Sequence, residues 1–166
     1  MRQTLKSLKR KPQVISYDRA RSIAILFAAG EDGPPLFLKR LIKHFRSDGK
    51  AAVALGYTSN LADPAKVTKE IQLCNRKDFF CHAKPKALFL RDFVVRDCDI
   101  LIDLTASDNM QMKLIAAASN AKFKAGAHHP DFLAIFDLNI KVSDDCGDEE
   151  LASHIVHYLK LIKTPG

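Results

Sequence analysis

The segment Asp99-Ile100-Leu101-Ile102-Asp103-Leu104 decides the fold of this chain. A short apolar run of this kind is typical of a parallel strand that is buried on both faces of a sheet. The residues that follow it, 108–119, have a helical pattern, and residues 121–126 are expected to form a second, brief strand. The stretch 97–126 therefore predicts a strand, a sharp turn, a helix and a second strand, as in an α/β sheet.

The first half of the chain repeats this arrangement. Residues 22–28 contain a continuous apolar run, which predicts a central strand. Glycines and prolines within 30–35 predict a loop, and residues 36–46 have the apolar spacing of an amphipathic helix. A strand over 50–56 completes a right-handed βαβ unit. We predict a three-layer αβα sandwich with five or six mostly parallel strands in a Rossmann-like arrangement, and a flavodoxin-like strand order is the alternative.

The remaining segments differ in how clearly they predict an element. Residues 87–95 and 148–163 have helical patterns, and a strand is expected around 135–140. Residues 67–74 fit a strand or a helix, and residues 78–82 fit a short strand or an exposed aromatic loop. We expect Ser107 or Asp108 to be the N-cap of the helix over 108–119, because such side chains accept a backbone N–H there.

Composition indicates one domain over residues 1–166, with residues 1–13 as a basic N-terminal arm. No apolar run approaches the roughly 20 residues that a membrane span requires. The four cysteines have irregular spacings without a Cys-x-x-Cys pair, which favours reduced thiols and a cytoplasmic location. Their spacing relative to the histidines matches no zinc motif, so we expect neither a metal nor a cofactor.

The net charge of +7 is distributed unevenly. Residues 1–50 contain 12 Lys and Arg against 4 acids, whereas residues 101–166 contain 6 against 9. The helix predicted over 36–46 has a polar face without acids, which forgoes the usual i, i+4 ion pairs. This face is either a solvated exterior or a surface for an anionic partner such as nucleic acid, and its residues are Lys39, Arg40, Lys43 and Arg46.

A ligand site is expected at the carboxyl ends of the predicted strands, where open α/β sheets bind their ligands. The residues expected there are Gly30, Tyr57, Thr58, Asp103, Thr105 and Ser107. Glu31, Asp32 and Asp103 are weak candidates for acid-base chemistry, because carboxylates brought together have raised pKa values. The chain contains no Gly-x-Gly-x-x-Gly, P-loop or Gly-x-Ser-x-Gly motif, so the sequence indicates no reaction and leaves open whether the protein is an enzyme.

Half of the chain resembles a family of short, uncharacterised bacterial proteins found mainly in the Bacteroidetes. The resemblance rests on an ordered set of short motifs between residues 78 and 163: Asp78-Phe79, Lys84-Pro85-Lys86, residues 98–104, residues 119–126, residues 136–140 and Tyr158-Leu159-Lys160. It implies an intracellular protein of unknown function without established catalytic residues. Residues 79–83 depart from the family pattern, in which an Asn-Trp pair and a glycine precede Lys-Pro.

A fainter resemblance connects the chain with the N-terminal half of ADP-heptose-type glycosyltransferases. In both, a strand ending in Ile-Asp-Leu is followed by a helix and an Ala-Lys-x-x-x-Gly strand, here residues 121–126. The resemblance implies an acid after the first strand, and Glu31 or Asp32 has that position. Such enzymes bind the nucleotide sugar mainly with a second α/β domain, for which 166 residues leave no room.

These observations lead to three functional hypotheses, and the oligomeric state is left open. The first is a protein that binds a small anionic or sugar-like ligand at the carboxyl ends of its strands without established catalysis. The second is a nucleic-acid or ribosome-associated module that uses the basic arm and the basic helix. The third is a small glycosyltransferase-like enzyme with Glu31 or Asp32 as its base.

Overall fold

The computed structural model describes residues 11–59 and 68–163, so the first ten residues of the predicted arm lie outside the described residues. Its six strands form one sheet in the order β3-β2-β1-β4-β5-β6, and every neighbouring pair is parallel. The predicted Rossmann-like sheet is confirmed, and the flavodoxin-like alternative is wrong, because β1 lies between β2 and β4 and a third strand lies outside β2. The strands are β1 (Ser22–Ala28), β2 (Ala51–Tyr57), β3 (Ile71–Cys74), β4 (Ile100–Asp103), β5 (Phe123–Ala127) and β6 (Leu138–Ile140).

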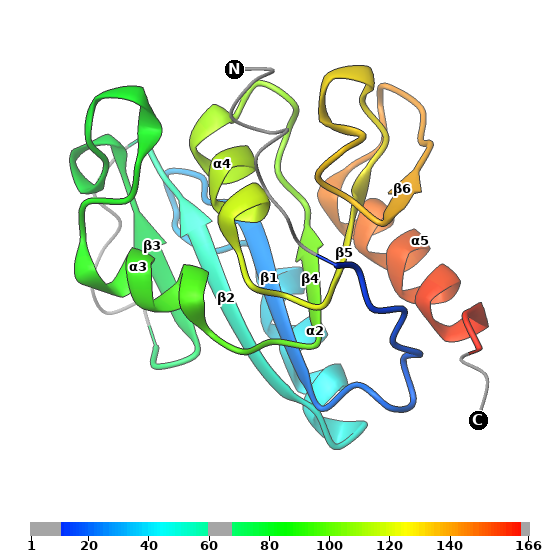
Figure 1. Cartoon of the computed structure of the whole chain (residues 1–166). Coiled ribbons are helices and arrows are strands. Elements are labelled where there is room, and N and C mark those ends of the chain that lie inside the picture. The colour runs from blue at the N-terminus through cyan, green and yellow to red at the C-terminus, as the bar shows by residue number, and fades with distance from the viewer. Residues whose placement is uncertain (1–10, 60–67, 164–166) are drawn as a thin grey trace.

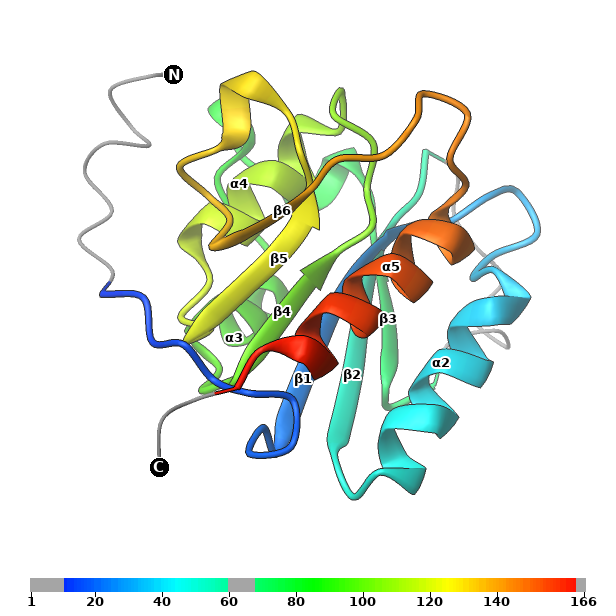
Figure 2. The same cartoon turned by 90° about the vertical axis from the view of Figure 1, so that its right-hand side faces the viewer.

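Within residues 11–59 and 68–163, four α-helices cover the two faces of this sheet and complete the three layers. Helices α2 (Leu36–Ser47) and α5 (Asp148–Leu161) lie side by side on one face, as Figure 2 shows. Helices α3 (Leu88–Val95) and α4 (Met110–Ala118) cover the other face (Figure 1). The chain therefore crosses on one face between β1 and β2 and on the other face from β3 to β4 and from β4 to β5.

Double burial explains the uninterrupted apolar runs of the central strands. Along β1, Ile23, Ile25 and Phe27 pack into the cluster beneath α2 and α5. The alternate residues Ala24 and Leu26 pack beneath α3 and α4. Because successive strand side chains point to opposite faces, a strand covered on both sides needs apolar residues at every position.

The carboxyl ends of β2 and β5 depend on close packing against glycine. A Cβ atom on Gly56 would collide with the ring of Phe27 and would lie 2.6 Å from Cδ2 of Leu73. A Cβ on Gly126 would lie 2.9 Å from the ring of Phe136. Aromatic rings therefore occupy the space that side chains would otherwise fill at this edge of the sheet.

The segments that the sequence left open have short or irregular structure. Residues 71–74 are the edge strand β3. Two 3₁₀ turns follow, η2 (Arg76–Asp78) and η3 (Cys81–Ala83), and Phe79 between them forms an isolated bridge with Pro85. A third 3₁₀ turn, η4 (Pro130–Phe132), precedes β6, which has only three residues and is shorter than predicted. Strands this short have too few residues for a period of two to be recognised in the sequence.

The predicted N-cap of α4 is wrong by one or two positions. The helix begins at Met110, and the side chain of Asn109 accepts the backbone N–H of Met112 at 3.2 Å. Ser107 and Asp108 lie in the exposed turn before it. All three residue types cap helices well, so the sequence could not distinguish between neighbouring positions.

Candidate functional site

The chain leaves the two central strands toward opposite faces of the sheet. After β1 it continues through residues 29–35 to α2, and after β4 it continues through residues 104–109 to α4. Because α2 and α4 cover different faces (Figures 1 and 2), the two loops diverge at the carboxyl ends of adjacent strands. Open α/β sheets bind their ligands at such a switch point. We therefore take this end of β1 and β4 as the candidate functional site.

A buried charged network lies directly at this point. Asp103, the last residue of β4, is fully buried, and its Oδ2 accepts a hydrogen bond from Nζ of Lys113 at 2.7 Å. Its Oδ1 accepts the backbone N–H of Thr105 at 2.8 Å and the Thr105 hydroxyl at 2.6 Å. The Lys113 side chain is 5% exposed. Nζ of Lys113 also donates to the backbone carbonyl of Thr105 at 2.9 Å and approaches its Oγ1 at 3.1 Å.

These contacts fix the β4–α4 loop from both sides. Asp103 holds the N–H and the hydroxyl of Thr105, while Lys113 holds its carbonyl oxygen from the second turn of α4. Removing a carboxylate and an ammonium from water is unfavourable by several kcal/mol per ion before the pair is formed. Hydrogen bonds to all three groups of Thr105 offset this cost, so the network orders the loop at the switch point.

A second carboxyl, that of Asp148, lies at the same end of the sheet. Asp148 is the first residue of α5 and is half-buried. Burial raises the pKa of Asp148, and the negative charge of Asp103 raises it further. The sequence explained Asp148 only as a complement to the helix dipole, because nothing local indicates that its helix begins near the end of β4.

The sequence missed Lys113 as well as Asp148. One signal was present: Lys113 is the only charged residue in the apolar helix α4. A lone lysine in such a helix is either exposed or paired with a buried acid, and the sequence does not tell which. Only the packing of α4 onto β4 brings its ammonium to Asp103.

The structure places the other predicted ligand residues around this network with different exposure. Gly30 lies in a tight turn in which its carbonyl accepts the N–H of Gly33 at 3.1 Å. Thr58 is buried, and Tyr57 is half-buried with its ring 6.4 Å from that of Phe79. Thr105 belongs to the buried network, whereas Ser107 is exposed in the next turn. The loops thus combine a fixed buried layer with exposed polar side chains above it.

The candidate acid-base residues occupy different environments. Glu31 and Asp32 are exposed in the turn after β1. Asp103 is buried and bonded to Lys113 and Thr105. The Asp103 carboxylate at the switch point is therefore bonded within the buried network, whereas the carboxylates of Glu31 and Asp32 are exposed in the loop after β1.

The predicted anionic-partner surface on α2 is exposed, but two of its four cations form ion pairs. Nη2 of Arg40 lies 2.8 Å from Oε1 of Glu149, and Nη2 of Arg46 lies 2.9 Å from Oε1 of Glu70. The hydrogen bond from Arg46 holds the pKa of Glu70 at about 2. Both acids come from segments that are distant in sequence. The sequence of the helix therefore does not show its acidic partners, and the folded structure does.

Metal and thiol chemistry find little support in the part of the chain that the structure describes. Residues 11–59 and 68–163 contain no group of three or more His, Cys, Asp or Glu side chains that could hold a metal ion. Burial raises the pKa of Cys74 to about 12 and that of Cys98 to about 11, so both thiols are poor nucleophiles. Among these described residues, no helix is both long and apolar enough to cross a membrane.

Comparison with known proteins identifies the family. A model of a family of unknown function (DUF6913) matches residues 1–162. The chain therefore belongs to this family. No curated protein and no solved structure matches it. The predicted membership of a family of unknown function is confirmed, whereas the link to the Bacteroidetes and the likeness to glycosyltransferases stay predictions.

Proposed function

We propose that this member of the DUF6913 family binds a small, neutral, sugar-like ligand at the carboxyl ends of β1 and β4, without catalysis. The supporting observation is the buried network of Asp103, Lys113 and Thr105 at the switch point of the sheet. The ligand contacts in this proposal come from the loops around it, at Gly30, Tyr57, Thr58, Ser107 and Asp148, with Asp103 and Thr105 as the layer beneath.

A buried ion pair is an expensive way to stabilise a fold, because apolar side chains of similar size do so at least as well. Buried charged groups concentrate at functional sites, where they hold a loop in the geometry that a ligand requires. The network of Asp103 and Lys113 lies where the fold class binds its ligands and not elsewhere in the core. This coincidence of chemistry and place favours a binding site.

The charge of the surrounding loops favours a neutral ligand over an anion. The loops that follow β1, β4 and β6 are residues 29–35, 104–109 and 141–147, and all of these residues are described. Lys141 is the only Lys or Arg among them. The same loops carry the acids Glu31, Asp32, Asp108, Asp144 and Asp145. Carboxylates accept hydrogen bonds from sugar hydroxyls but repel phosphates and carboxylates. A sugar-like ligand is therefore preferred to the anionic metabolite that the sequence left equally open.

Binding rather than catalysis is proposed because the buried groups are already engaged. Nζ of Lys113 makes contacts with Asp103 Oδ2, Thr105 O and Thr105 Oγ1, which accounts for the three donors of an ammonium. Both oxygens of Asp103 accept hydrogen bonds within the network. In this proposal these residues orient the loop, because their hydrogen bonds are made within the network.

The two alternative functions stay separate proposals with their own tests. Nucleic-acid binding by the basic face of α2 requires affinity that falls steeply with salt and falls again in Lys39→Gln and Lys43→Gln. Glycosyl transfer with Glu31 or Asp32 as base requires activity that disappears when both are changed to their amides. No observation in the structure favours either over ligand binding at the switch point.

The test is a thermal-shift screen of the purified chain with neutral monosaccharides and with the 6-phosphates of the same sugars. We expect a neutral sugar to raise Tm and its phosphate to raise it less. Calorimetric titration of the sugar should then show affinity about two- to tenfold weaker in Ser107→Ala and in Asp148→Asn, the range expected for one lost hydrogen bond. Asp18→Asn, an exposed acid remote from the site, is the matched control.

Two outcomes would contradict the proposal. A panel of neutral sugars without any stabilising member would overturn it. So would a ligand whose affinity is unchanged in both Ser107→Ala and Asp148→Asn, since it would then bind elsewhere.

A further inference from the structure

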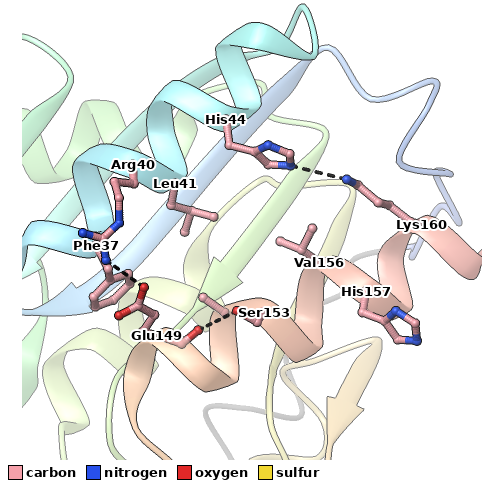
Figure 3. A pocket seen from close by; sticks show the side chains of 10 residues that line it. Phe37, Arg40, Leu41, His44, Glu149, Ser153, Val156, His157 and Lys160 are labelled. Atoms are coloured by element: carbon pink, nitrogen blue, oxygen red, sulfur yellow. Dashed lines mark hydrogen bonds and ion pairs between the residues drawn. The ribbon is translucent and has the colours of Figure 1, made fainter.

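A groove of about 460 Å³ runs between α2 and α5 on the outer side of the sheet, from the N-terminal turns of the two helices to Lys160 near the end of α5. Figure 3 shows side chains from both helices along its two walls. Its lining residues are Phe37, Arg40, Leu41, His44, Glu149, Ala152, Ser153, Val156, His157 and Lys160. The volume lies within the range of roughly 300–1,000 Å³ that is usual for small-molecule sites.

The floor of the groove is apolar. Phe37 and Leu41 of α2 and Val156 of α5 are half-buried and pack against the core beneath the two helices, and Ala152 is buried among them. Part of each of these side chains still faces the groove. An apolar ligand segment placed there would bury this surface, at roughly 25 cal/mol per Å².

The two ends of the groove differ in charge. At the end near the helix N-termini, Arg40 is neutralised by Glu149 at 2.8 Å. At the other end, Nζ of Lys160 lies 3.3 Å from Nε2 of His44, and Figure 3 shows these two side chains pointing toward each other from opposite walls. This second end presents an ammonium and an imidazole to a ligand.

One carboxylate lies close to that end and is shared among several donors. Oδ2 of Asp48 lies 3.9 Å from Nζ of Lys160 and 3.5 Å from Nε2 of His44. The same oxygen accepts the hydroxyl of Tyr17 at 2.6 Å. Nζ of Lys160 also lies 5.0 Å from the centre of the Tyr17 ring. Its contact with Asp48 is long and the ring takes up no hydrogen-bond donor, so the ammonium keeps donors for a further anionic group.

We infer that the groove binds a small amphipathic anion, with an apolar chain along Phe37, Leu41 and Val156 and a carboxylate-type head group at Lys160 and His44. The arrangement of an apolar floor with one cationic end matches the two parts of such a molecule. The two proposed sites adjoin at the start of α5, where Asp148 belongs to the first and Glu149 lines the groove, but the head group proposed here lies at the far end of the groove and the ligand differs in charge.

The experiment compares three probes on the isotopically labelled full chain: octanoate, octanol and acetate. Octanoate has both parts, octanol lacks the charge and acetate lacks the chain. We expect octanoate to shift the methyl resonances of Leu41 and Val156 in NMR spectra at lower concentration than octanol. Acetate should shift neither at the same concentration.

Variants separate the charged contribution from the apolar one. Lys160→Gln should weaken octanoate binding about two- to fivefold, the range of a partly exposed ion pair, and leave octanol binding unchanged. Ser153 is exposed on the α5 wall, so Ser153→Glu and Ser153→Lys change charge without disturbing the core. Ser153→Glu should weaken octanoate binding and Ser153→Lys should strengthen it.

Three results would overturn the inference. The first is no shift of the Leu41 and Val156 methyls with octanoate, the second is equal binding of octanoate and octanol, and the third is equal binding to Ser153→Glu and Ser153→Lys. Circular dichroism of each variant shows whether it is folded, and the Ser153 pair keeps the test valid if Lys160→Gln is unstable. Because a neutral sugar binds elsewhere in our proposal, its affinity should be the same in all of these variants.

Discussion

Strand β4 has an aspartate–lysine pair at each end, and the two pairs differ in burial rather than in length. Asp99, just before the strand, lies 2.8 Å from Nζ of Lys122, and Asp103, its last residue, lies 2.7 Å from Nζ of Lys113. Lys122 is 37% exposed and Asp99 13%, whereas Lys113 and Asp103 are 5% and 0% exposed. The pair of Asp99 and Lys122 is therefore partly exposed to solvent, whereas the pair of Asp103 and Lys113 is buried.

The difference shows what each pair does. At the amino end, Asp99 also accepts the backbone N–H of Arg21 at 2.8 Å and that of Ser22 at 3.3 Å, so it fastens the start of β1 beside β4. Burial opposes ionisation of Asp99, but the hydrogen bonds from Lys122 and Arg21 outweigh it and lower the pKa. At the carboxyl end, the pair holds one loop in place where the fold binds ligands. The first pair aligns two strands, and the second orders the loop at which we propose a ligand site.

The largest expected effect is that of Lys113→Met. Removing the ammonium leaves the Asp103 carboxylate buried and uncompensated, which should lower the free energy of unfolding by about 3–5 kcal/mol. Urea denaturation measures this change. In Asp103→Asn combined with Lys113→Met, the buried charge is gone and part of the loss should be recovered. A loss below that of a surface substitution would show that water reaches the pair.

Thr105→Val should have the second largest effect. Valine keeps the shape of threonine but removes the hydroxyl that donates to Asp103 at 2.6 Å. Oδ1 of Asp103 keeps the backbone N–H of Thr105 but loses its second donor, and Nζ of Lys113 loses its contact with the hydroxyl, which should lower the free energy of unfolding by about 1–3 kcal/mol. Thr105→Ser retains the hydroxyl and is the matched control. If the two variants are equally stable, the hydroxyl contributes nothing to the network.

Lys122→Met should have a smaller effect than either. Asp99 keeps its backbone partners and remains in contact with solvent, so no buried charge is left without compensation. The loss should also shrink as salt is added, because exposed pairs are screened. Denaturation at low and at high salt measures both properties. If Lys122→Met lowers the free energy of unfolding as much as Lys113→Met does, burial does not distinguish the two pairs.

The smallest effect is a pH dependence that comes from Asp148. Its pKa is raised in the folded chain, so the folded state holds this proton more tightly than the unfolded state. The contribution of Asp148 to stability is therefore fully present below its ordinary pKa and is lost as the pH rises through the raised value. An NMR titration of Asp148 should show a pKa that is lower in Asp103→Asn but still raised, because burial is the larger cause. An unchanged pKa of Asp148 in Asp103→Asn would show that the charge of Asp103 does not influence Asp148.

Much of the fold was predictable because the relevant signals are local. The apolar run of β1 is buried, and residues 36–47 form the amphipathic helix α2, whose buried residues are Leu38, Ile42 and Phe45. The edge strand β3 was not predictable, because its four residues pair on one side only with β2 and carry too short a pattern. The cap at Asn109 was missed for a similar reason, since its neighbours are equally good caps.

The candidate site also has a part that the sequence predicted and a part that it did not. The sequence predicted that Asp103 and Thr105 follow a buried strand, and the structure brings both to the switch point. It did not predict that Lys113 pairs with Asp103, or that Glu149 and Glu70 neutralise Arg40 and Arg46. Each of these contacts joins segments whose distance is set by the packing of helices on the sheet.

The sequence by itself determined the α/β class, the strands buried on both faces and the edge of the sheet at which polar residues gather. These follow from the continuous apolar runs of the strands and the helical spacing of apolar residues, which each segment carries independently of the others. Only the tertiary structure decided the strand order, the partner of each charge and the groove between α2 and α5. An ion pair or a groove exists only when segments far apart in the chain come together, and a short local pattern does not contain that distance.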